Sequence, residues 1–150
     1  MEFPRHEFSS VKDLCFAAIR KFRPTLLSLT RLSAGGVVLP VEARYTHELS
    51  RACYEILGDI FLDPEWKGRS SCGKVDFYIE PVKWAIKCDR EGTRLQEHIR
   101  RFQPGGKYYP WIESGEIKDY ILLDFRTSKP TEPQGMFAFS SGLIGADQSR

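Results

Sequence analysis

The order of hydrophobic patterns along this chain constrains its fold more than any other feature. Two patterns typical of strands are followed by one typical of a helix and then by another typical of a strand. The first two occupy Gly73 to Gly92 (GKVDFYIEPVKWAIKCDREG), where apolar and polar residues alternate on both sides of a Pro81-Val82 turn. Thr93 to Phe102 places apolar residues at helical spacing, and Tyr120 to Phe125 (YILLDF) is apolar enough for a central strand. Consecutive strands followed by a helix that crosses to another strand indicate a small mixed sheet flanked by helices.

The segments on either side extend this pattern. Helical periodicity predicts helices over Val11–Phe22 and Val41–Leu57, and Asp59–Asp63 (DIFLD) is a candidate strand. The predicted order is αβββαβ, an α/β fold, preceded by an extra N-terminal helix. After Arg126 the chain is rich in Pro, Ser, Thr and Gly, so we expect at most one short strand, Met136–Phe139, and a mobile end.

Composition and charge are those of one globular domain. The 150 residues are 41% hydrophobic and 28% charged, and the formal net charge is +2. Positive charge is concentrated between Lys83 and Lys107, where seven Lys or Arg residues stand against three acids. Such a segment favours phosphate groups, although a solvated helix face has the same composition.

The spacing of the cysteines and the shortness of the apolar runs indicate an intracellular protein. The 4 cysteines are scattered and form no C-x-x-C pair, which argues against a disulfide framework or a zinc site. We therefore expect reduced thiols in an intracellular protein. The polar start MEFPRHEFSS carries no secretory signal and the apolar runs are too short to cross a bilayer, so we expect no membrane contact.

Three charged residues in the first strand pair form the candidate site. Because side chains alternate across a strand, Val75 and Phe77 are expected to face the core, while Asp76, Lys87 and Asp89 project together from the opposite side. Such a group suits phosphodiester hydrolysis, in which one or two carboxylates hold Mg²⁺ and a lysine positions the attacking water. The candidate carboxylates on the preceding helix are Glu42, Glu48 and Glu55. Of these we favour Glu48.

Plainer structural roles remain open for the same residues. Asp76 can instead bind a loop, and Lys87 with Asp89 can form an exposed pair that contributes about 0–1 kcal/mol. His98 lies beside a predicted apolar helix stripe, so we expect a half-buried helix residue in preference to a catalytic base. Tyr108 is expected to pack in the core.

Several segments carry motifs that together have a family resemblance. They are RLSAGGVVLPVEARYTHELSRACYEIL, GKVDFYI, KWAIKCDREGTRLQEHIRRF and GKYYPWIESGEIKDYILLDFR. The most specific parts are the aspartate in VDFYI, the W-x-I-x-x-x-R-x-G run, the EH-x-x-RF helix and the LLDFR strand. Over Leu32 to Arg126 the chain resembles the restriction-endonuclease-like (PD-(D/E)XK) domain of Crinkler-type effectors and their fungal relatives.

The resemblance implies an αβββαβ nuclease core at residues 32–126, between an N-terminal helical extension (1–31) and a partly flexible tail (127–150). It also implies nucleic acid, with DNA expected, as the partner, Mg²⁺ as the cofactor of an active enzyme, and action inside a cell, the nucleus included. The expected nucleic-acid contacts are Arg90, Arg94, Arg101 and Lys107. The tail offers no clear counterpart of the family's final apolar strand.

One departure from the family pattern decides the functional expectation. The relatives carry glutamate after W-(G/A)-I, whereas this chain has Lys87, although Asp76 and Arg90 match. A cation at that place repels Mg²⁺. We therefore expect a nucleic-acid-binding domain whose metal-dependent cleavage is lost or strongly reduced, with Lys87 contacting phosphate. One alternative is an active Mg²⁺ nuclease with Asp76, Asp89 and Glu48 as metal ligands; another is a protein-interaction module on the same fold.

Overall fold

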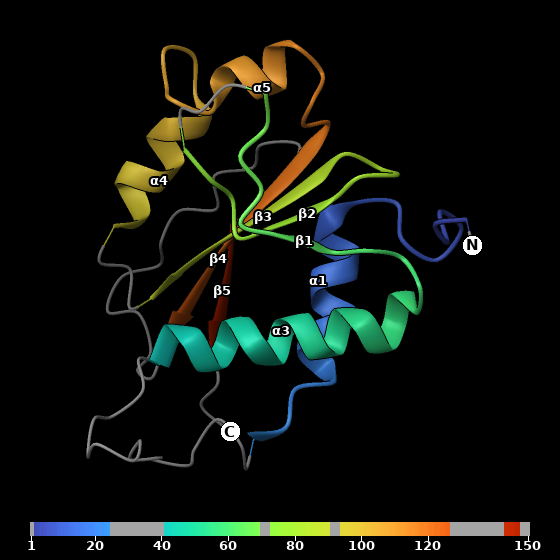
Figure 1. Ribbon diagram of the computed structural model, residues 1–150. Helices are drawn as coiled ribbons and strands as arrows, with labels where there is room; N and C mark the ends of the chain where they lie inside the picture. The colour runs from blue at the N-terminus through green and yellow to red at the C-terminus, as the bar shows by residue number, and fades with distance from the viewer. Residues whose placement is uncertain (1, 25–40, 70–72, 91–93, 127–142, 148–150) are drawn as a thin grey trace.

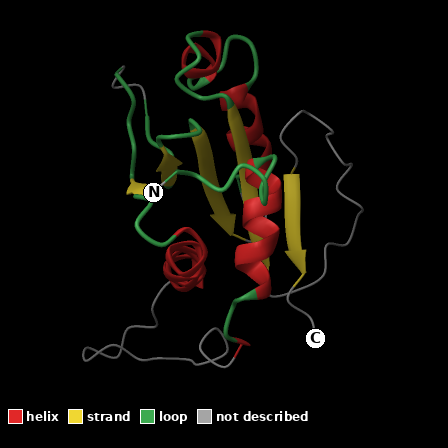
Figure 2. Cartoon of the chain, turned by 90° about the vertical axis from the view of Figure 1, so that its right-hand side faces the viewer, coloured by secondary structure: helices red, strands yellow, loops and turns green. Residues whose placement is uncertain are grey.

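The computed structural model describes residues 2–24, 41–69, 73–90, 94–126 and 143–147 of the chain. Its centre is a mixed sheet of 5 strands, which lie side by side in chain order. They are β1 (Asp63–Pro64), β2 (Phe77–Ile79), β3 (Trp84–Arg90), β4 (Asp119–Arg126) and β5 (Leu143–Asp147). Neighbours from β1 to β3 are antiparallel, and those from β3 to β5 are parallel. Figure 2 shows the strands side by side, with β5 at one edge of the sheet.

Helices cover both faces of this sheet. Helices α1 (Val11–Arg20) and α3 (Val41–Leu57) lie on one side, and α4 (Leu95–Phe102) and α5 (Tyr109–Glu113) lie on the other (Figure 1). The mixed sheet and its flanking helices confirm the predicted α/β class. None of the helices in the described ranges combines the length and apolar character that a membrane crossing requires.

Helix α1 is held to the sheet from its first residue. Ser10 caps the helix and forms a capping box with Asp13, which satisfies free backbone N–H groups at the helix start. The backbone N–H of Val11 donates to Oδ2 of Asp119 at the start of β4, over 3.0 Å. Since α1 also contacts α3, β3 and β4, it belongs to the same core as the sheet.

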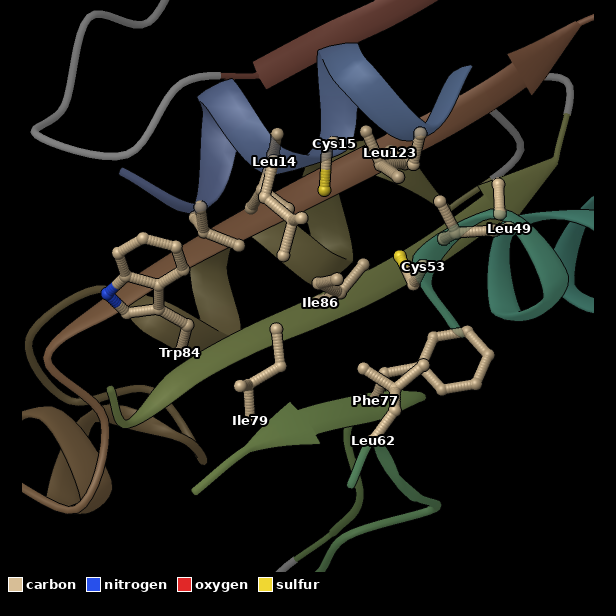
Figure 3. Packing of buried hydrophobic residues seen from close by; sticks show 14 of the residues in the cluster. Leu14, Cys15, Leu49, Cys53, Leu62, Phe77, Ile79, Trp84, Ile86 and Leu123 are labelled. Atoms are coloured by element: carbon tan, nitrogen blue, oxygen red, sulfur yellow. The ribbon is translucent and has the colours of Figure 1, made fainter. Parts of the chain in front are cut away.

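The core between the sheet and α1/α3 is apolar and closely packed (Figure 3). It is formed by side chains on one face of the central strands, including Ile86 and Cys88 of β3 and Leu123 of β4. The apolar side chains of α1 and α3 that face the sheet complete it. Cys15 and Cys53 project into this core, and neither they nor Cys88 form a disulfide. Burial raises the pKa of Cys15 far above its usual value and that of Cys53 to about 12. The described cysteines therefore agree with the expected reduced state, while Cys72 lies outside the described residues.

The opposite face of the sheet carries a second core, which is rich in aromatic rings. Tyr78 stacks on Trp66 with ring centroids 4.1 Å apart, and Tyr108 stacks on Trp111 at 4.9 Å. Phe102 of α4 joins this group to Tyr120 of β4 at 4.2 Å. The expected packing role of Tyr108 is thus confirmed, and α4 and α5 are fixed over this face.

Several expected elements differ in the structure. The strand expected at Asp59–Asp63 is only Asp63–Pro64, because Gly58 turns the chain at a φ of 61° and Ile60 still bonds back to Leu57. Val75 packs in the aromatic core and not beside Phe77, because the chain bends between them.

Two further differences concern the helical face and the tail. His98, and not Ile99, is buried with Leu95 and Phe102 in α4. Residues 143–147 form β5, which pairs with β4 and corrects the expectation that the tail has no clear final strand. The strand expected at Met136–Phe139 lies outside the described residues.

Candidate functional site

Five ionisable side chains gather on the α4 side of the sheet, near the carboxyl ends of the parallel strands. They are Asp76, Lys87, Asp89, His98 and Asp124, and we call them the strand-end cluster. All except Asp76 are buried. Sheets with parallel strands bind ligands at the carboxyl ends of these strands, so the cluster is the candidate functional site.

Asp76 and Lys87 form an ion pair across β2 and β3. The pairing of Phe77 with Ile86 places Asp76 opposite Lys87, and Nζ of Lys87 lies 3.2 Å from Oδ2 of Asp76. The backbone N–H of Cys88 donates to the same oxygen over 2.7 Å. The two side chains are only 11% and 18% exposed. The prediction that Asp76 and Lys87 project from one side of the strand pair is therefore confirmed.

Asp89 points to the same side but has different partners. Its Oδ2 accepts the backbone N–H of Arg94 at the start of α4 over 3.3 Å, a position where a negative charge is favourable to the helix. Its Oδ1 lies 3.9 Å from Nε2 of His98. Asp89 and Asp124 are register partners in the parallel β3–β4 pair, so both carboxylates belong to this side of the sheet.

His98 stands between charges of both signs. Burial lowers its pKa below the usual value, the positive charge of Lys87 adds to this, and the negative charge of Asp89 opposes it. The imidazole is therefore neutral at neutral pH. A guanidinium nitrogen of Arg101 lies 3.4 Å from Nδ1, and arginine can only donate, so Nδ1 is the acceptor and Nε2 carries the proton. The prediction of a half-buried helix residue is corrected, because His98 is buried against the cluster.

The donor set around Asp76 does not fit Mg²⁺. This ion takes hard oxygen ligands in an octahedral arrangement, but the ammonium group of Lys87 already lies against Oδ2 of Asp76. Asp89 follows Lys87 by two residues, a rise of about 7 Å along β3. Its carboxylate already accepts the backbone N–H of Arg94 at the start of α4. Among the residues that the structure describes, no group of 3 or more His, Cys, Asp or Glu side chains is arranged to hold a metal ion.

The structure does not bring Glu48 to this cluster. Its carboxylate accepts hydrogen bonds from Arg23, in the chain that follows α1, and from Arg51 of α3. Burial alone would raise its pKa, but these hydrogen bonds outweigh burial and lower it to about 2. Helix α3 covers the other face of the sheet, so the assignment of Glu48 as a partner of Asp76 is corrected: Glu48 joins α3 to the chain that follows α1.

The expected nucleic-acid contacts lie on and after α4. Arg94 and Lys107 are exposed, whereas Arg101 is half-buried, donates to the hydroxyl of Tyr108 over 3.3 Å and pairs with Glu97. The side chain of Arg90 lies outside the described part of the chain. Beside the last turn of α4 is a surface hollow of about 600 Å³, which we call the α4 hollow. It is lined by Glu97, Arg100, Arg101, Gln103, Pro104, Gly105, Gly106 and Lys107.

Sequence reasoning missed Asp124 as a site residue and undervalued His98, and it left Arg100 open between a solvated helix face and a phosphate contact. Asp124 left one signal, since it is the single charged residue in the apolar run YILLDF. His98 left another, because it stands three residues after Leu95 and four before Phe102, the spacing of one helix face. The position of Arg100 beside the Gly105-Gly106 turn depends on how the chain folds after α4, and no local pattern indicates it.

Comparison with known protein families, with curated proteins and with solved structures finds no match to this chain.

Proposed function

We propose that this chain is a nucleic-acid-binding domain derived from a restriction-endonuclease-like, Crinkler-type nuclease, in which a lysine stands where the nuclease held its metal. The order of α3, three strands, α4 and β4 agrees with the αβββαβ core of that family. The VDFYI, W-x-I and LLDFR segments, on which the resemblance rests, supply β2, β3 and β4. These observations support the proposed descent.

The observation that carries the proposal is the ion pair between Lys87 and Asp76. A metal-dependent nuclease needs a divalent cation at its carboxylates to offset charge at the scissile phosphate. In this chain the ammonium of Lys87 neutralises Asp76 at 3.2 Å and would repel an incoming cation. The pair thus removes negative charge that would repel nucleic acid, without supplying the water activation that cleavage requires.

The burial of Lys87 changes its expected role. At 11% exposure and in contact with Asp76, Lys87 is poorly placed to reach a phosphate itself. Its contribution is to neutralise Asp76, while the phosphate contacts fall to exposed cations such as Arg94 and Lys107.

Binding across a salt series tests the first half of the proposal. The wild-type protein should bind fluorescently labelled duplex DNA at low salt, and the logarithm of its affinity should fall linearly with the logarithm of salt concentration, because phosphate contacts release counterions. An unrelated acidic domain of similar size serves as the control for non-specific signal. Absence of binding at low salt to both duplex and single-stranded probes would refute the proposal and favour a protein-interaction module.

A plasmid-cleavage assay with Mg²⁺ or Mn²⁺ tests the second half. We expect no cleavage by the wild type and, if the remaining scaffold is intact, gained cleavage in Lys87→Glu, which returns the family's acid to β3. The matched control is Lys87→Gln, which removes the cation without adding an acid. Cleavage by the wild-type protein that disappears in Asp76→Ala would contradict the proposed loss of activity.

A further inference from the structure

We infer that the α4 hollow, and not the strand-end cluster, is the anchoring site for the phosphodiester backbone, with Arg100 and Lys107 as its direct phosphate contacts. This inference rests on the proposed nucleic-acid binding and adds the surface that performs it. The sequence leaves Arg100, like Arg94 and Arg101, open between a solvated helix face and a phosphate contact; its assignment comes from its position in the hollow.

The hollow has the charge that a phosphate ligand requires. Its lining holds three cations (Arg100, Arg101 and Lys107) and one acid (Glu97), which gives a net charge of 3 − 1 = +2. Glu97 pairs with Arg101, and in the described part of the chain neither Arg100 nor Lys107 takes part in an ion pair. Two exposed cations are therefore available to a ligand. Its volume of about 600 Å³ is also in the range of ligand-binding pockets.

The strand-end cluster offers no such charge. Its only lysine is paired with Asp76 and is nearly buried, and two further carboxylates, Asp89 and Asp124, lie on the same side of the sheet. A phosphate that bound there would have to displace the ion pair between Lys87 and Asp76. The electrostatic difference between the two surfaces favours the hollow.

The wall of the hollow is fixed before a ligand arrives. The guanidinium of Arg101 lies 5.8 Å from the ring centre of Tyr108 and donates to its hydroxyl, and the hydroxyl of Tyr108 in turn donates to the carbonyl of Lys74. The N–H of Tyr108 bonds to the carbonyl of Arg101 over 2.7 Å, which ties the chain after Lys107 to the end of α4. Only the side chains of Arg100 and Lys107 have to be ordered on binding, so the entropic cost is confined to these two side chains.

A helix end normally presents carbonyl groups that repel an anion, but here the turn covers them. The carbonyl of Arg100 accepts from the N–H of Gln103 over 3.2 Å, and that of Gln103 accepts from Gly106 over 2.7 Å. Gly106 lies so close to the helix that an added Cβ would be 2.1 Å from the carbonyl oxygen of Arg100. Because these carbonyls are occupied, the unfavourable end of the helix dipole is reduced where the phosphate binds.

The test compares two double variants that change the net charge equally. Arg100→Gln/Lys107→Gln removes the two proposed contacts, and Lys12→Gln/Arg20→Gln removes two exposed cations from α1 across the sheet. Affinity for a labelled duplex DNA is measured between about 50 and 200 mM salt. Log affinity falls as log salt concentration rises, and each lost contact to duplex DNA makes this fall less steep by about 0.9. The slope of the Arg100→Gln/Lys107→Gln variant should therefore be less steep than that of the wild type by about 1.8. Over this fourfold range of salt concentration, the affinity of the wild type should therefore fall by a factor about twelvefold larger than that of the variant.

The outcomes separate the inference from the proposed function. A reduced slope in the hollow variant and an unchanged slope in the α1 variant support the inference. If the wild type binds DNA but the two variants behave alike, the hollow is refuted and the proposed function stands. If the wild type binds no nucleic acid, both fail. Binding of labelled polyglutamate as tightly as DNA, lost in the same variant, would assign the hollow to an acidic protein partner and overturn the inference.

Discussion

The ion pair between Asp76 and Lys87 can be measured by a double-mutant cycle on folding stability. Lys87→Met keeps the length and apolar stem of the side chain and removes its charge. Asp76→Asn keeps an oxygen that can accept the N–H of Cys88, which the aspartate accepts over 2.7 Å. The double variant completes the cycle and isolates the contribution of the pair from those of the single changes.

The burial of the pair sets the expected magnitude. Exposed ion pairs contribute about 0–1 kcal/mol, and removal of one partner from a fully buried pair costs about 3–5 kcal/mol. With side chains 11% and 18% exposed, this pair lies between the two cases. We expect Lys87→Met to lower the free energy of unfolding by about 2 kcal/mol and the coupling energy to be about 1–2 kcal/mol. The corresponding fall in Tm is about 4–8 °C.

Urea unfolding followed by tryptophan fluorescence gives these free energies. Lys74→Met is the matched control, because Lys74 pairs with Glu65 at 47% and 68% exposure and should contribute less than about 1 kcal/mol. A coupling energy within about 0.3 kcal/mol of zero would refute the reasoning, since it would give the pair no more weight than a surface contact. The same result would remove the argument that Lys87 serves as the counter-ion of Asp76.

Other predictions follow from single contacts. The pKa of Glu48 is about 2, against an ordinary value of 4.5, so the ionised carboxylate stabilises the folded state by up to about 3 kcal/mol. This contribution is complete above pH 4.5 and is lost as the pH falls through 2. Measured by unfolding at a series of pH values, Glu48→Gln should abolish this part of the acid dependence. In a Cys72→Ser variant the remaining thiols should react with Ellman's reagent at pH 8 only after unfolding, and rapid labelling of the native protein would contradict their burial in the core. Gly105→Ala should cost about 1 kcal/mol because of its φ of 83°, whereas Gly106→Ala should cost more because its Cβ would meet the carbonyl of Arg100, a ranking that thermal unfolding can check.

Elements whose pattern is local were the predictable part of this fold. Val41–Leu57 is a helix over the expected range, because its apolar stripe and the glycine after it are visible in the sequence. The alternation in β3 also predicted that Lys87 and Asp89 share a side, and the turn at Pro81-Val82 set the register that brings Asp76 to Lys87.

Elements defined by distant parts of the chain could not be predicted. Strand β5 is stabilised by pairing with β4, and its sequence LIGAD has no strand signal strong enough to stand alone. The placement of Asp89 beside Asp124 depends on the register of two strands separated by α4 and α5. Glu48 was misassigned for a similar reason, since its partner Arg23 lies 25 residues earlier, in the chain that follows α1.

The hydrogen bond from Val11 to Asp119 has a consequence for the order of folding. It joins positions 108 residues apart, so the start of α1 is completed only when β4 is in place. Closing so long a loop is entropically costly, and contacts of this kind slow folding. Helix α1 is translated before β4 and is therefore expected to dock late, and until β4 has been synthesised the apolar stripe of α1 is a surface on which chaperones or aggregation can act.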